Sequence, residues 1–186
     1  MLYRVLFLFF ALILHLTGGE VDRFIDAARS QIGVTLYYDP SYVKLDYPMG
    51  DVDPSRGVCT DVVVRALRKL GIDLQERIYL DRKRHPARYM GLYGGSRADP
   101  NIDHRRVKNI QAYLQSRSMR VRDRFRPGDI VIWKLPGSNL DHIGICTDRM
   151  NEKGEPYIIH NVGYGTKEED LLREYIIVDH FRIFGK

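Results

Sequence analysis

The chain has 186 residues, of which 44% are hydrophobic and 28% are charged, and its formal net charge is +5. This length and composition suit one globular domain with its own core, and they exclude collagen-like, low-complexity and disordered chains. The basic excess contains no basic run interleaved with aromatic residues, so we expect no nucleic-acid partner.

The first residues have the pattern of a secretory signal peptide. Arg4 precedes an apolar run from Val5 to Leu14, and small residues follow it. An uncleaved anchor is the alternative, but the run is shorter than the roughly 20 residues that span a bilayer. We expect residues 1–19 to be removed, leaving one exported, periplasmic domain over 20–186 that meets the membrane only during export. Its positive charge suits an anionic envelope polymer such as peptidoglycan.

The exported part begins with segments of helical character. Apolar residues at helical spacing predict a helix over 21–32. An irregular segment rich in Tyr, Asp, Pro and Gly follows over 35–57. A second amphipathic helix then follows, with Cys59 in or just before its first turn and Gly71 as its stop. Residues 75–105 have a helix-poor pattern, and a further helix runs from Val107.

The last third of the chain has the pattern of β-strands. Four β-branched, aromatic-rich runs are separated by turn residues. They cover residues 127–135, 142–148, 156–163 and 173–184. Helices followed by an antiparallel meander predict an α+β domain in which the Cys59 helix packs on the sheet.

Cys59 has the position of a nucleophile. Free N–H groups and the helix dipole at a helix start favour a thiolate over a thiol. The alternative is a small hydrophobic residue packed under the helix. Export also permits a disulfide with Cys146, which would consume the nucleophile. Cys146 lies about 13 Å along its strand from His142, beyond the roughly 7 Å Cα limit for a bridge if His142 is beside Cys59.

Two histidines can complete a catalytic group with Cys59. His142 opens one predicted strand and His160 lies in the next, so both side chains can share the face that meets the Cys59 helix. A cysteine, a histidine base and a polar group that orients the base make a papain-type triad. We expect no metal, because neither H-x-x-x-H nor C-x-x-C spacing occurs.

The motifs GVCTD, PGDIVIWKL, DHIGICTD and YIIHNVG, in this order, resemble the NlpC-type cell-wall cysteine peptidases. The resemblance implies a papain-like fold with N-terminal helices packed on an antiparallel sheet, and a reaction without a cofactor. It also implies Cys59 as nucleophile, His142 as base and His160 as the orienting group, with Tyr38 near the family's tyrosine ahead of the cysteine. YYDPSYVKLDYPMGD and NIDHRRV resemble more closely a bacterial exported family catalogued as a domain of unknown function.

The segment Asp103, His104, Arg105 and Arg106 departs from the NlpC-type pattern, as does the Thr60-Asp61 pair after the cysteine. One interpretation is a helix start with Asp103 as its cap and the basic residues exposed. The functional interpretation is a substrate site, in which Asp103 holds one guanidinium while the other binds a substrate carboxylate.

These features together predict an exported cysteine hydrolase that cleaves amide bonds, most simply in peptidoglycan stem peptides. Two alternatives belong to other classes. One is a non-catalytic envelope-binding module with a structural Cys59–Cys146 bridge. The other is a lipid-directed acyltransferase or thioesterase, which the apolar content of the cleft would distinguish.

Overall fold

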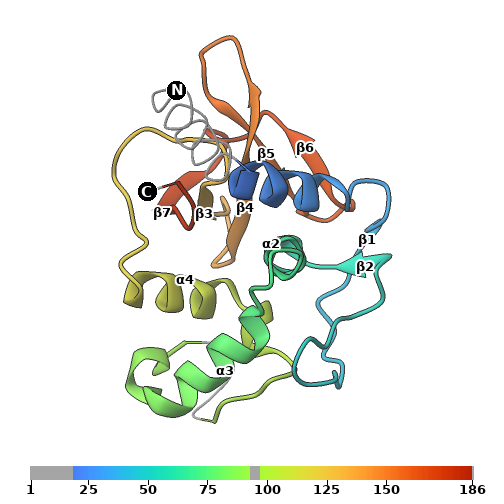
Figure 1. The fold of residues 1–186 in the computed structure, drawn as a ribbon, viewed down its shortest axis with the longest axis vertical. Coiled ribbons are helices and arrows are strands. Elements are labelled where there is room, and N and C mark those ends of the chain that lie inside the picture. The colour runs from blue at the N-terminus through green and yellow to red at the C-terminus, as the bar shows by residue number, and fades with distance from the viewer. Residues whose placement is uncertain (1–18, 93–96, 186) are drawn as a thin grey trace, which may run out of the picture.

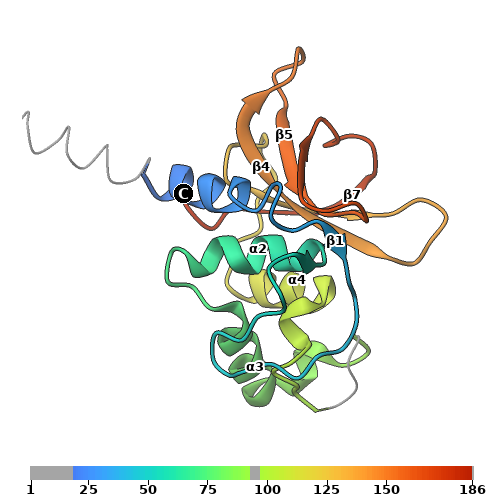
Figure 2. The same cartoon turned by 90° about the vertical axis from the view of Figure 1, so that its right-hand side faces the viewer.

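Helices packed on a five-stranded antiparallel sheet make up the described protein (Figures 1 and 2). The computed structural model describes residues 19–92 and 97–185. The predicted signal peptide therefore lies outside the described residues, except for Gly19. Within those two ranges, no helix has the length and apolar character needed to cross a bilayer.

The helices lie in the first two thirds of the chain, as the sequence predicts. The first described helix covers residues 19–29. The others are α2 (Cys59–Arg68), α3 (Leu74–Arg84) and α4 (Val107–Ser116), with short 3-10 turns η1 (Pro86–Tyr89) and η2 (Asp103–Arg105). Gly71 ends the α2 region with a φ of 77°, a conformation that glycine adopts without strain.

The sheet has the strand order β6-β5-β4-β3-β7, and all neighbouring strands are antiparallel. Its strands are β3 (Ile130–Lys134), β4 (Asp141–Met150), β5 (Pro156–His160), β6 (Lys167–Glu169) and β7 (Ile176–Phe181). The four predicted strands are confirmed as β3, β4, β5 and β7. The last strand does not extend the meander but returns to the opposite edge, beside β3. A separate parallel pair joins β1 (Tyr37–Tyr38) to β2 (Arg56–Gly57).

Each strand sends alternate side chains to two different apolar clusters. On one face, Ile143 and Ile145 of β4 are buried with Val63 and Leu67 of α2. This face carries α2, which packs on β4 and β5 and lies next to the sheet in both views (Figures 1 and 2). On the other face, Trp133, Cys146 and Ile158 are buried with Leu171, Leu172 and Val131.

The prediction of a helix-poor region over 75–105 is wrong for α3. This helix buries Leu74 and Ile78 but is otherwise rich in charged side chains, so its apolar period is weak. A start signal is present, because the Asp73 carboxylate accepts the N–H of Gln75 at 3.1 Å and caps the helix. The helix is held by packing on α2, η1, η2 and α4.

Candidate active site

Cys59 is the first residue of α2, in agreement with the sequence-based prediction. The carboxylate of Asp61 accepts the N–H of Val58 at 2.7 Å, which fixes where the helix begins. Cys59 as a whole residue is 4% exposed. The backbone N–H groups of Ile143 on β4, of Thr60 and of Cys59 itself lie near enough to the sulphur to lower its pKa. The helix start thus holds the sulphur against strand β4.

The Cys59 thiol is not the stabilised thiolate that the helix start alone predicts. Burial, together with the Asp61 carboxylate, raises the pKa of Cys59 to about 12. The N–H groups of Ile143, Thr60 and Cys59 lower the pKa, but they do not offset the loss of hydration. The resting group is therefore a neutral thiol, which needs a base to become a nucleophile.

His142 and His160 meet on neighbouring strands, as predicted. Nε2 of His142 lies 3.0 Å from Nδ1 of His160, and both rings are buried. Gly144 makes this approach possible, because a Cβ at position 144 would lie 2.6 Å from Ile158 Cγ2 and 3.2 Å from His160 Cβ. The glycine of the HIG motif therefore leaves the space in which the His160 side chain crosses towards β4.

The face on which the two histidines lie differs from the expectation. Strand alternation directs them to the Trp133 side of the sheet, away from the apolar residues under α2, and the Trp133 and His142 ring centroids are 5.8 Å apart. Cys59 lies near the start of β4, where the N–H of Ile143 lowers the pKa of the thiol. Ile143 directly follows His142, so the thiol lies close to the part of β4 that carries the imidazole. The thiol comes from the start of α2 and the imidazole from the start of β4, two elements that pack on one another.

Glu169 extends this arrangement, and the sequence analysis missed it. Its Oε2 atom lies 2.9 Å from Nε2 of His160. The carboxylate side chain is 45% exposed, whereas that of His160 is 1% exposed. Glu169 ends β6, a three-residue strand of charged side chains that carries no apolar alternation, so its sequence gave no signal for the contact. His142, His160 and Glu169 thus form a row of hydrogen-bonded side chains that runs from the sheet interior to the solvent.

Both histidines are held neutral. Burial, together with the neighbouring His160, lowers the pKa of His142 to about 3. Burial also lowers the pKa of His160, against the opposing influence of Glu169. A neutral imidazole has one protonated nitrogen and one lone pair, so each ring can donate one hydrogen bond and accept another.

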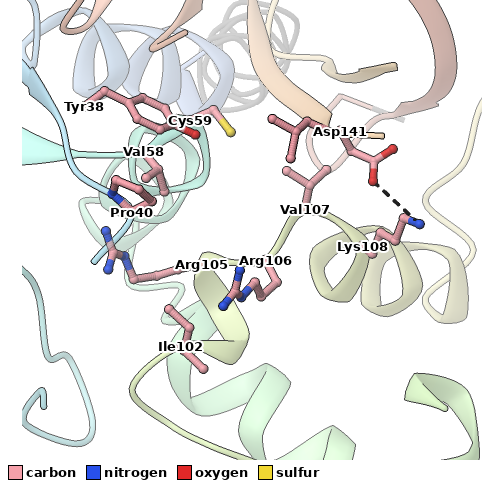
Figure 3. A pocket seen from close by; sticks show the side chains of 11 residues that line it. Tyr38, Pro40, Val58, Cys59, Ile102, Arg105, Arg106, Val107, Lys108 and Asp141 are labelled. Carbon is pink, nitrogen blue, oxygen red and sulfur yellow. Dashed lines mark ion pairs between the residues drawn. The ribbon is translucent and has the colours of Figure 1, made fainter. Parts of the chain in front are cut away.

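A cavity of about 310 Å³ opens in front of Cys59 (Figure 3). The sulphur and the Tyr38 ring stand at one side of it, and Asp141 and Lys108 at the other, paired at 3.8 Å. Burial raises the pKa of the Tyr38 hydroxyl to about 12, so it remains a neutral hydrogen-bonding group. The lining is mixed in polarity and comprises Tyr38, Pro40, Val58, Cys59, Ile102, Arg105, Arg106, Val107, Lys108, Leu140 and Asp141.

Asp103 and Arg105 have structural partners that the sequence analysis did not identify. Asp103 neither caps α4 nor holds a neighbouring arginine, because it forms a buried ion pair with Arg82 of α3. Arg105 donates to the Asp61 carboxylate, with Nε–Oδ1 and Nη2–Oδ2 distances of 3.0 Å each. Arg105 also donates to the backbone carbonyl groups of Asp39 and Ser41. This clamp joins the tyrosine-rich segment to the start of α2.

His104 and Arg106 occupy different environments. His104 is 2% exposed and lies outside the cavity lining, and burial, with Arg68 and Arg105 nearby, lowers its pKa to about 3. Arg106 lines the cavity that Cys59 borders, and Figure 3 shows its guanidinium there. Of the four residues in the predicted DHRR site, Arg105 and Arg106 border the cavity, and Arg105 already has a carboxylate partner.

Neither the disulfide nor a metal site is formed by the described residues. Cys59 and Cys146 are both free thiols, and they belong to the two different apolar clusters of the sheet. In the part of the chain that the structure describes, no three His, Cys, Asp or Glu side chains are grouped so as to hold a metal ion.

Comparison with known proteins gives a family but no activity. A family model described as "Domain of unknown function (DUF1287)" matches residues 25–183. "Uncharacterized protein YijF" of Escherichia coli (strain K12) is 46% identical over 167 residues, which cover 87% of this chain and 80% of that protein. No solved structure matches the chain significantly.

Proposed function

This chain belongs to the DUF1287 family, and we propose that it is an exported, papain-like cysteine hydrolase that cleaves amide bonds in the stem peptides of peptidoglycan. The observation that carries the proposal is the buried His142–His160 pair. His142 directly precedes Ile143, the β4 residue whose N–H lowers the pKa of the Cys59 thiol. A buried, hydrogen-bonded histidine pair beside a cysteine at a helix start is the arrangement that nucleophilic acyl transfer needs.

The proposed reaction starts from a neutral thiol and a neutral imidazole. As the Cys59 sulphur forms a bond to the substrate carbonyl carbon, its proton passes to Nδ1 of His142 and the carbonyl electron pair moves to oxygen. N–H groups of the first turn of α2, at Cys59 and Thr60, are the available donors for that oxyanion. His142 then returns the proton to the leaving amine, and water hydrolyses the thioester by the reverse steps.

The cavity lining supports a charged peptide as the substrate. Stem peptides carry free carboxylates, and Arg106 and Lys108 offer cationic groups at the wall of the cavity. Asp141, on the same wall, is paired with Lys108 at 3.8 Å and with Lys134 at 3.2 Å. These charged side chains favour a peptide over the acyl chain that a lipid-directed enzyme would hold, because burying charges against hydrocarbon is unfavourable.

The test is digestion of purified peptidoglycan by the chain without residues 1–19. We expect wild-type protein to release fragments whose masses correspond to hydrolysis of a peptide bond, and Cys59→Ala protein to release none. His142→Ala should also abolish release, whereas His160→Asn should retain part of it, because asparagine keeps a polar partner for His142.

Cys146→Ala is the matched control, since Cys146 is buried in the apolar cluster around Trp133 and does not line the cavity. It should digest peptidoglycan like the wild type. Two outcomes would overturn the proposed function. One is equal digestion by the wild-type and Cys59→Ala proteins, and the other is no digestion by folded wild-type protein.

A further inference from the structure

Glu169 is the outermost member of the hydrogen-bonded row that begins at His142. It is the partner of His160 at 2.9 Å, and it reaches the solvent while both histidines are buried. Glu169 is not the proposed nucleophile, and it does not line the cavity in front of Cys59. The question is what an exposed carboxylate contributes at the far end of a buried histidine pair.

Hydrogen-bond direction answers this question. A carboxylate only accepts, so His160 must carry its proton on Nε2. A neutral His160 then has its lone pair on Nδ1, which lies 3.0 Å from Nε2 of His142. His142 must therefore donate from Nε2, and the lone pair of the neutral ring is left on Nδ1. The row has one consistent direction, set by Glu169 at its outer end.

We propose that Glu169 is a positioning residue that selects the tautomers of both histidines, so that Nδ1 of His142 is free to accept the Cys59 proton. This inference rests on the proposed function for its catalytic meaning, but the tautomer selection itself is a separate property of the protein. Without Glu169, the His142–His160 bond forms equally well in the opposite direction. His142 would then carry its proton on Nδ1 and would be unable to act as the base.

Tautomers are observable without any substrate. In wild-type protein labelled with ¹⁵N at histidine, long-range ¹H–¹⁵N spectra at pH 7 should show His142 and His160 both protonated at Nε2. Glu169→Ala should produce a mixture of the two directions. Glu169→Lys should reverse both rings, because an ammonium group donates to Nε2 of His160 and forces its proton to Nδ1.

Glu168 provides the matched control on the same strand. Its carboxylate accepts from Arg29 at 3.1 Å, so Glu168→Ala removes a β6 carboxylate without touching the histidines. It should leave both tautomers unchanged. Glu169→Gln is a second variant that keeps the side-chain size, but its amide can donate as well as accept, so it should produce a mixture of the two directions as Glu169→Ala does.

Activity supplies the second measurement. If peptidoglycan digestion is observed, Glu169→Ala should lower kcat by about tenfold to a hundredfold, the range of outer-shell partners of a functional histidine, with KM unchanged. Glu169→Lys should lower it further. Wild-type tautomers in folded Glu169→Lys protein, or a wild-type His142 protonated at Nδ1, would overturn the inference. Failure of digestion with the expected tautomer reversal would overturn the proposed function and leave the selection by Glu169 established.

Discussion

At the scale of single residues, two opposing effects act on the pKa of the Cys59 thiol. The N–H groups of the α2 start and of Ile143 favour a thiolate, and burial opposes it more strongly. With a pKa of about 12, the thiolate fraction at pH 7 is on the order of 10⁻⁵. The helix start is therefore not sufficient to activate Cys59, and His142 must take its proton during the reaction.

The pH dependence of alkylation tests this state. In Cys146→Ala protein, which retains one thiol, the rate of iodoacetamide modification at Cys59 should be well below that of a free cysteine at pH 7. It should then rise about tenfold per pH unit from pH 7 to 10, because only the thiolate reacts. The modified residue is identified by peptide mass. A rate that is already fast and level below pH 8 would show a resting thiolate–imidazolium pair instead.

At the scale of elements, Arg105 and Arg106 are adjacent in sequence but have different roles. Arg105 ties η2 to the start of α2 through Asp61 and to the segment before Pro40 through the Asp39 carbonyl. Removing one partner of a buried ion pair costs about 3–5 kcal/mol. Arg105→Ala should therefore lower the melting temperature markedly, since the Asp61 carboxylate would remain buried without its cation.

Arg106→Ala should change substrate binding instead. Loss of a cationic side chain from the cavity wall should raise KM for a peptide with a free carboxylate by about tenfold or more, as expected for a charged hydrogen bond. The same peptide with an amidated carboxyl group should be affected much less. Comparing melting temperature and KM for both arginine variants separates the two roles. A tenfold KM increase in Arg105→Ala without loss of stability would contradict this assignment.

At the scale of the whole molecule, folding buries three neutral histidines. The pKa values of His142 and His104 are lowered to about 3, and that of His160 is also lowered. The unfolded chain, with histidine pKa values near 6.5, binds more protons between pH 6.5 and 3. The free energy of unfolding should therefore decrease as the pH falls through this window, by up to roughly 1.4 kcal/mol per pH unit for each histidine.

Urea unfolding between pH 7 and pH 4.5 measures this loss, and His104→Gln isolates one contribution. The variant should reduce the pH dependence by about 1.4 kcal/mol per pH unit relative to the wild type. His85→Gln is the control, because the His85 side chain is 53% exposed. An unchanged slope in folded His104→Gln protein would show that His104 becomes protonated without unfolding.

The sequence by itself determined the features that depend on local period and turn chemistry. The start of α2 at Cys59, its end near Gly71, and the neighbouring strands of His142 and His160 all follow from patterns a few residues long. The glycine of the HIG motif, Gly144, is also visible in the sequence. Its role, to leave space for the His160 side chain, becomes clear only in the structure.

The tertiary structure alone decided the properties that depend on residues distant in the chain. Packing buried Cys59 and reversed the expected direction of its pKa shift. Pairing across 44 positions made Arg105 a clamp for Asp61, and the short strand β6 brought Glu169 to His160. No repeating pattern in the sequence predicts desolvation or long-range ion pairs, because both arise only when elements distant in the chain pack together and exclude water.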